Sequence, residues 1–128
     1  MAVLGVGIDL VEVAQAQRML DRWGERLLRR VLTEEERSYV LRFSRPAKHL
    51  AARLAAKEAV YKALQGVAGM RGIGWLAIEV ERDREGRPSV RLEGEAAALA
   101  RAAGVVRISL SLSHTDNTAG AVAVAEGS

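Results

Sequence analysis

The segment HLAARLAAKEAVYKALQ, residues 49–65, decides the fold, because its apolar side chains surround almost the whole helical wheel. Leucines and Tyr61 occupy one side of the wheel, and small alanines occupy the other. A helix of this kind belongs in the interior of a domain. With Pro46 near its first turn, the pattern predicts one long central helix that runs to about Gln65 and is covered by other elements.

Four charged side chains interrupt this apolar surface in two narrow strips, Arg53 with Lys57 and Glu58 with Lys62, each pair spaced by four residues. One explanation is a surface ion pair between Glu58 and Lys62, which would contribute only about 0.2–0.5 kcal/mol and would need no function. The other is that phosphate groups and a metal ion satisfy the four charges. The scarcity of polar surface on the helix favours the second explanation.

The first strand is predicted over residues 3–11, where bulky and small side chains alternate. One face carries Leu4, Val6, Ile8 and Leu10. The other face carries Gly5, Gly7 and Asp9, and two glycines inside a strand indicate the close approach of a ligand or of another backbone. Asp9 either accepts backbone hydrogen bonds at the strand end or joins Glu58 in holding magnesium, which typically takes one or two protein carboxylates.

The rest of the pattern indicates further helices and strands around the central helix. Residues 14–32 predict a helix with an arginine-rich outer side, and Thr33 with Glu36 forms a capping box for a short helix to about residue 42. Downstream, strands are predicted at 75–81, 89–92, 105–113 and 118–125, with a turn at 83–88 and a helix at 95–103. This order predicts a single α+β domain over residues 1–128, with a mainly antiparallel sheet packed against helices.

The composition limits the chemistry that is open to the chain. It has 128 residues, of which 49% are hydrophobic, so it is large enough for one domain with its own core. The absence of cysteine excludes a disulfide framework, a thiolate zinc site and a cysteine nucleophile, and it fits a reducing compartment. No signal peptide or membrane helix is recognisable, so we expect a cytoplasmic protein without a membrane partner.

The charge of the chain favours an anionic partner. A net charge of +3 and a pI near 9.8 would suit nucleic acid, an acidic protein or a phosphate-bearing small molecule. Proteins that bind single-stranded nucleic acid usually stack bases on aromatic side chains, whereas this chain has one Phe, two Tyr and two Trp. We therefore expect no nucleic-acid partner.

Five blocks of the sequence resemble the holo-[acyl-carrier-protein] synthases, which are 4′-phosphopantetheinyl transferases. In chain order they are GIDLVEV (7–13), RLAAKEAVYKAL (53–64), IGWLAIEV (73–80), EGRPSVRLEG (85–94) and SLSHTDNTAGAVAV (111–124). The resemblance covers essentially the whole chain. It implies the fold of that family and transfer of the 4′-phosphopantetheine group of coenzyme A to a serine of apo acyl carrier protein, for fatty acid biosynthesis. The second product would be adenosine 3′,5′-bisphosphate.

The same resemblance implies roles for individual residues. Asp9 and Glu58 would hold magnesium and, with the phosphate-contacting Lys62, would form the catalytic group, while coordinated water or a nearby carboxylate would help to deprotonate the serine. The implied coenzyme A-binding set is Arg53, Lys62, Arg87, Pro88, His114 and Thr115. A lone histidine at a strand end is commonly structural, so we expect His114 to bind or position phosphate rather than to act as a base. A solvated hairpin tip would explain Arg87 equally well.

The arginine-rich side of residues 14–32 implies a docking site for the acidic carrier protein. It carries Arg18, Arg22, Arg26 and Arg29, and the family docks its carrier on this first helix. The alternative is a solvated face in which Glu25 and Arg29 form an ordinary pair. The family commonly has arginine where this chain has Gln15, so docking would rely more on Arg18 and Arg22. Family members are typically trimers with interface active sites, which implies a homotrimer.

Two alternatives without catalysis stand beside this interpretation. One is a basic oligomeric module that binds nucleic acid, and the other is a coenzyme A sensor that binds without transfer. Asp9 and Glu58 discriminate against the first, because a basic binding module has no use for two carboxylates at a phosphate site.

Overall fold

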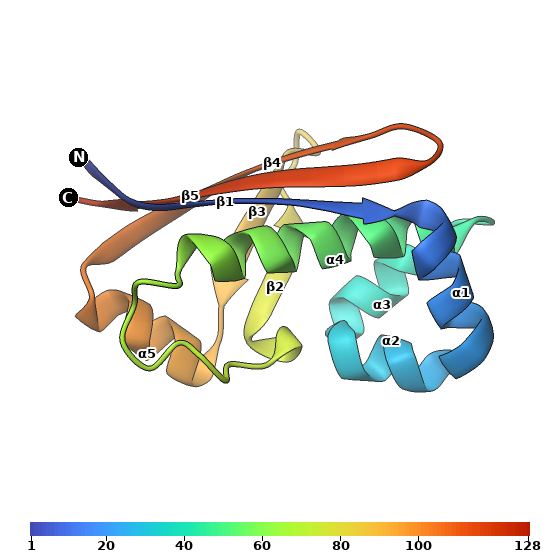
Figure 1. Cartoon of the computed structure of the whole chain (residues 1–128), viewed down its shortest axis with the longest axis horizontal. Helices are drawn as coiled ribbons and strands as arrows, with labels where there is room; N and C mark the ends of the chain where they lie inside the picture. Colours follow the sequence, from blue (N-terminus) through green and yellow to red (C-terminus); the bar gives the residue numbers. More distant parts are fainter.

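Strand β5 (Thr118–Gly127) lies in the middle of a three-stranded antiparallel sheet, between β1 (Ala2–Glu12) and β4 (Val105–His114). The computed structural model describes residues 1–128 and shows this sheet stretched along the long axis of the molecule (Figure 1). The register of β1 on β5 places Ala2 opposite Gly127 and Asp9 opposite Ala121. Because β5 is the only strand that pairs with β1, the N-terminal strand joins the sheet through β5 alone.

The central helix α4 (Pro46–Ala63) lies along one face of this sheet, directly beneath β1 (Figure 1). A Cβ atom at Gly5 would lie 1.8 Å from the carbonyl oxygen of Ala63, and one at Gly7 would lie 1.9 Å from that of Ala59. No side chain fits in that space. The close approach predicted for the two glycines is therefore made by the backbone of α4 and not by a ligand.

Most residues of α4 are buried, which confirms the predicted central helix. The helix contributes to two apolar clusters. One fills the space between α4, the three-stranded sheet, the β2–β3 region and the last helix, and the other lies between α4 and the N-terminal helices. Alternate residues of β5 supply the sheet side of the contact: Ala119, Ala121, Ala123 and Ala125, all buried. Their small side chains let the helix and the sheet pack closely.

Three short helices connect β1 to α4: α1 (Val13–Trp23), α2 (Glu25–Val31) and α3 (Glu34–Val40). The single helix predicted over residues 14–32 is wrong. Gly24 adopts φ 56° and ψ −136°, a conformation that ends α1 and begins α2 and that glycine reaches without steric cost. The predicted capping box is confirmed, since the Glu36 amide donates to Thr33 Oγ1 at 3.3 Å and Thr33 N–H donates to Glu36 Oε1 at 2.8 Å.

A second, two-stranded sheet consists of β2 (Ile78–Arg82) and β3 (Pro88–Leu92) and makes no backbone pairing with the first. The strand predicted from residue 75 begins at Ile78 instead, because Trp75–Ala77 forms one turn of 3₁₀ helix. Helix α5 (Gly94–Ala102) then leads to β4. Antiparallel strands and packed helices confirm the predicted α+β class.

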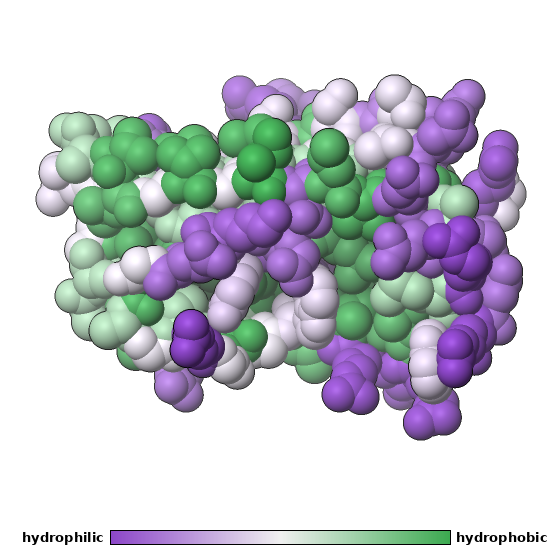
Figure 2. Space-filling view, viewed as in Figure 1, coloured by the Kyte–Doolittle hydropathy of each residue, from purple (hydrophilic) through white to green (hydrophobic).

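The side of β1 that points away from α4 is apolar and exposed. On β1 the side chains of Leu4, Val6, Ile8 and Leu10 are 47%, 61%, 61% and 70% exposed. Figure 2 shows apolar surface gathered along the strand side of the molecule, toward the two chain ends. A continuous patch of this kind typically marks an interaction surface. None of the helices combines the length and apolar character needed to span a bilayer.

Candidate active site

Asp9 and Lys62 meet at the junction between β1 and α4. Lys62 Nζ lies 3.1 Å from Asp9 Oδ1 and donates a second hydrogen bond, of 3.0 Å, to the carbonyl oxygen of Ile8. Asp9 projects from the same side of β1 as Gly5 and Gly7, so the absence of side chains at the two glycines brings this carboxylate down to the helix. Two of the three predicted catalytic residues are therefore in direct contact.

Glu58 lies one helical turn before Lys62 and has neither an ion-pair nor a hydrogen-bond partner. The Glu58–Lys62 surface pair considered as an alternative is not formed, because Lys62 turns to Asp9 instead. Glu58 lines a cavity of about 170 Å³ together with Tyr61, Ile73 and Trp75. A half-buried carboxylate without a partner beside an open cavity is a group available to a ligand.

The residues present fit a magnesium ion. Magnesium keeps several waters and substrate oxygens and needs only one or two protein carboxylates, which Asp9 and Glu58 supply on the same side of α4 as Lys62. The structure contains no group of three or more His, Cys, Asp or Glu side chains placed to hold a metal. A closed site built only of protein ligands, of the kind that structural zinc uses, is thus not formed by these side chains.

Lys57 does not act as the sequence suggested, since its charge is satisfied by protein groups and not by phosphate. The side chain is fully buried, and Lys57 Nζ lies 2.6 Å from Glu36 Oε1. Burial lowers the pKa of Lys57, while the negative charge of Glu36 acts in the opposite direction. The expectation that phosphate or metal satisfies all four charges on α4 is therefore wrong for Lys57.

Arg53 is almost completely buried and lies against an aromatic ring. Its guanidinium carbon is 4.3 Å from the centroid of Tyr39, and the guanidinium groups of Arg42 and Arg82 lie 5.7 and 5.6 Å from the same centroid. Arg53 Nε has no hydrogen-bond partner. Burial lowers the pKa of Arg53, and the Tyr39 phenol opposes that shift. All four residues line a cavity of about 600 Å³ between α3 and β2.

Sequence reasoning missed Tyr39, Arg42 and Arg82 as neighbours of Arg53. Tyr39 and Arg42 could have been found from their spacing of three residues, which places an aromatic ring and a cation on one side of a helical segment. Arg82 carried no such signal, because only the three-dimensional fold brings β2 against α3.

His114 and Thr115 stand where β4 ends. Thr115 Oγ1 accepts hydrogen bonds from Asn117 N–H at 3.1 Å and Thr118 N–H at 3.0 Å, so its hydroxyl closes the turn into β5. His49 of α4 is a neighbour that the sequence did not reveal. Burial lowers the pKa of His49, and the nearby charges of Arg53 and His114 add to that shift. His114 and Arg53, both predicted to bind coenzyme A, thus both act on the pKa of His49.

Arg87 and Pro88 lie at the tip of the β2–β3 hairpin. Arg87 Nε contacts Asp83 Oδ2 at 3.1 Å, and the guanidinium is largely exposed. The cavity beside the tip, about 480 Å³, is completed by residues 108–112 of β4 and contains neither Asp9 nor Glu58. Within one chain the structure does not bring Arg87 to the carboxylates.

The predicted carrier-docking arginines are exposed but belong to two helices. Arg18 and Arg22 lie on α1, and the Arg22 guanidinium lies 5.0 Å from the ring centroid of the exposed Trp23. Arg26 follows the break at Gly24 and lines a cavity of about 270 Å³ between Trp23 and the side chains of α2. Gln15 is exposed on the first turn of α1.

The fold belongs to a known class of transferase, as comparison with known proteins shows. The model of the 4′-phosphopantetheinyl transferase superfamily matches residues 5–123, and the chain belongs to this family. Among curated relatives, the holo-[acyl-carrier-protein] synthase of Moorella thermoacetica is 47% identical over 126 residues, which is 98% of this chain and 96% of the relative.

Solved structures of the same family match over nearly the whole chain. The holo-[acyl-carrier-protein] synthase of Neisseria meningitidis superposes with a TM-score of 0.89 at 32% identity, covering 98% of this chain and 99% of that one. The Bacillus anthracis synthase, in complex with coenzyme A (3′,5′-ADP), has a TM-score of 0.78 at 32% identity and covers 98% of both chains. These findings confirm the predicted family and fold.

Proposed function

We propose that the protein transfers the 4′-phosphopantetheine arm of coenzyme A to a serine of apo acyl carrier protein, as a step in fatty acid biosynthesis. The observation that carries this proposal is the Asp9–Lys62 contact beside the unpartnered Glu58, on a fold whose relatives are holo-[acyl-carrier-protein] synthases. One of those relatives holds coenzyme A in its solved structure.

In this reaction the serine Oγ attacks the phosphorus atom that carries the pantetheine arm. A new P–O bond forms, the bond to the bridging pyrophosphate oxygen breaks, and adenosine 3′,5′-bisphosphate leaves. The serine proton passes to a water molecule or a nearby carboxylate. Lys62 can contact a phosphate oxygen, because Ile8 O and Asp9 Oδ1 accept only two of the three donors of its exposed ammonium. The protein's main contribution is to position the reactants and to balance the charge that moves onto the leaving group.

We assign magnesium to Asp9 and Glu58. When bound there, the ion would neutralise pyrophosphate charge and polarise the phosphorus. With Lys62 held by Asp9, the carboxylate is fixed in orientation before any ligand arrives. Glu58, without a partner, is free to take its ligand.

The nucleotide end of coenzyme A is assigned to the predicted binding residues Arg53, Arg87, Pro88, His114 and Thr115. Arg53 and His114 both influence the pKa of His49, whereas Arg87 lies at the hairpin tip beside a cavity that none of the other assigned residues except Pro88 lines. An active site at a subunit interface reconciles these positions, because the hairpin of one subunit can reach the site of its neighbour. The exposed apolar face of β1 supplies a surface on which a homotrimer would form. A cytoplasmic location stays a prediction from the sequence.

The test is intact-protein mass spectrometry of apo acyl carrier protein after incubation with this protein, coenzyme A and magnesium. We expect the carrier to gain the mass of one phosphopantetheine group and adenosine 3′,5′-bisphosphate to appear in equal amount. In a parallel reaction, Glu58→Gln should lower kcat roughly 100-fold or more while its circular dichroism and Tm stay close to wild type. Glu25→Gln, an exposed change on α2, serves as the matched control.

Several outcomes would decide against the proposal. Absence of the mass gain with several carrier proteins would leave only a coenzyme A sensor or a basic binding module. Full activity of Glu58→Gln would remove Glu58 from the magnesium site. Equal activity after magnesium is chelated with EDTA would remove the metal from the reaction.

A further inference from the structure

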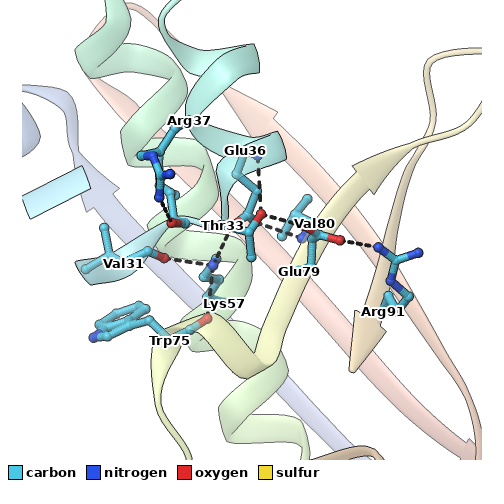
Figure 3. Close-up of polar contacts among 10 residues, drawn as sticks. Val31, Thr33, Glu36, Arg37, Lys57, Trp75, Glu79, Val80 and Arg91 are labelled. Atoms are coloured by element: carbon cyan, nitrogen blue, oxygen red, sulfur yellow. Dashed lines mark hydrogen bonds and ion pairs between the residues drawn. The ribbon is translucent and has the colours of Figure 1, made fainter. Parts of the chain in front are cut away.

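Lys57 and Glu36 form a fully buried ion pair that the proposed reaction does not use. Each proton of the Lys57 ammonium has a separate acceptor: Glu36 Oε1 at 2.6 Å, the carbonyl oxygen of Val31 at 2.8 Å and that of Trp75 at 3.0 Å (Figure 3). An ammonium has three donors, so Lys57 has none left for a substrate. The pair must therefore act through the groups that it holds.

Glu36 is held as completely as Lys57. Its Oε1 also accepts from Thr33 N–H, and its Oε2 accepts from Val80 N–H, each at 2.8 Å. Beyond it, the Thr33 hydroxyl donates to Glu79, which pairs with Arg91 of β3 (Figure 3). The network thus ties α4 to the end of α2, to α3, to the Trp75 turn and to the β2–β3 hairpin.

This network contacts the candidate active site at two points. The next residue on α4 is Glu58, and the Trp75 main chain that Lys57 binds forms one wall of the cavity that Glu58 lines. The Trp75 turn and the hairpin have no backbone pairing with the main sheet. Apart from backbone hydrogen bonds within the loop that follows α4, the Lys57 hydrogen bond to the Trp75 carbonyl ties that wall directly to α4.

We infer that Lys57 and Glu36 are positioning residues for the transfer reaction, which fix the Trp75 wall and the orientation of Glu58 within their shared cavity. The inference rests on the proposed function. A stability argument alone does not explain the pair, because apolar residues of similar volume often replace a buried ion pair without loss of stability. If the ion pair positions the site, its removal should instead lower kcat, because small displacements of reacting groups have large effects on the rate of the chemical step.

The test compares Lys57→Met with the double variant Lys57→Met/Glu36→Leu. The single variant leaves a buried carboxylate without its partner, so its Tm should fall by roughly 10 °C or more. In the double variant the Tm should return to within a few degrees of wild type. Its kcat should nevertheless be about 10-fold lower, with less than a twofold change in KM for coenzyme A, since the nucleotide-binding residues are untouched.

A second readout does not depend on catalysis. In a Trp23→Phe background, Trp75 is the only tryptophan, and its quenching by acrylamide should rise in the double variant because the turn has lost the Lys57 hydrogen bond. Glu36→Gln provides a variant of nearly unchanged shape, for which we expect a several-fold lower kcat. Arg107→Gln removes an exposed pair on β4 and serves as the control with wild-type kcat and Tm.

A double variant, or a folded Glu36→Gln, with wild-type kcat and unchanged Trp75 quenching would overturn the inference. A rise in KM without a fall in kcat would also overturn it, since the pair would then act on binding. If neither variant folds, the pair is a requirement of folding and not a positioning device. Failure of the wild-type protein to modify any carrier protein would instead count against the proposed function itself.

Discussion

Gly7 is one of two glycines of β1 that pack against the backbone of α4, and it has no room for a methyl group. A Cβ atom there would meet the Ala59 carbonyl oxygen at 1.9 Å and the Ala63 amide nitrogen at 2.8 Å, both rigid backbone atoms. We expect Gly7→Ala to destabilise the protein by roughly 3 kcal/mol, because the strand must move away from the helix. Urea unfolding followed by circular dichroism measures this loss.

A matched glycine provides the control for that prediction. Gly66 lies just after α4, has no atom within 4 Å of its ideal Cβ position and does not have a positive φ. Gly66→Ala should leave the unfolding free energy within about 0.5 kcal/mol of wild type. Equal stability of the two variants would show that the contact at Gly7 adapts.

The sequence was sufficient to predict the charged side chains of the site, but only some of the contacts that they make. Asp9 and Lys62 were identified, and the structure brings them together, although 53 positions separate them. The partner of Lys57 could not be predicted, because Glu36 lies 21 positions away and its visible role was the capping box. A local pattern shows which residues share a helix face, but not which distant residue that face will meet.

Among the elements, β2 depends on a carboxylate that is sensitive to acid. Burial raises the pKa of Glu79, but hydrogen bonds from Thr33 and Arg91 outweigh it and hold the pKa below its usual value of 4.5. A carboxylate with a lowered pKa in the folded state stabilises the protein above its unfolded pKa. That contribution is lost as the pH falls from about 4.5 through the lower folded value.

We therefore expect Glu79→Gln to lose roughly 1–3 kcal/mol of stability at pH 7, because the charge-assisted hydrogen bonds weaken. The difference from wild type should shrink at pH 3, where wild-type Glu79 is losing its charge. Calorimetric unfolding at both pH values measures this. Glu25→Gln, which breaks an exposed pair with Arg29, should change stability by less than about 1 kcal/mol at either pH.

Helix α1 is the element on which we expect the carrier protein to dock. Arg18 and Arg22 are exposed on it, ahead of the break at Gly24. Reversing both to Glu should raise KM for the acidic carrier protein at least tenfold and leave KM for coenzyme A within about twofold, because like charges repel across an interface. Steady-state kinetics with each substrate varied in turn measures the two constants. Equal effects on both would place the arginines outside the carrier site.

Element types were largely predictable, and element boundaries less so. The alternation of β1 and the wheel of α4 gave strong periodic signals that the structure confirms. The break at Gly24 was missed because one glycine is tolerated inside a helical pattern unless a positive φ is required. The turn at Trp75–Ala77 was read as strand because the apolar run continued into β2 without a visible boundary.

For the molecule as a whole, the exposed face of β1 makes the proposed trimer testable. Val6 is 61% exposed, and its side chain points away from α4. We expect wild type to run as a trimer in light scattering coupled to size exclusion, and Val6→Glu to run as a monomer with little phosphopantetheine transfer. Leu41→Glu, at an exposed position after α3, should remain trimeric. A monomeric wild type with full activity would contradict both the assembly and the interface site.

The central position of β5 has a consequence for how the protein is made. During synthesis β1 leaves the ribosome early, but its only partner strand, β5, is more than a hundred residues behind it. At about 5–20 residues per second the apolar β1 waits unpaired for roughly 5–20 seconds. The sheet therefore closes only after β5 has emerged, and nascent chains stalled before residue 118 should depend on chaperones that shield this strand.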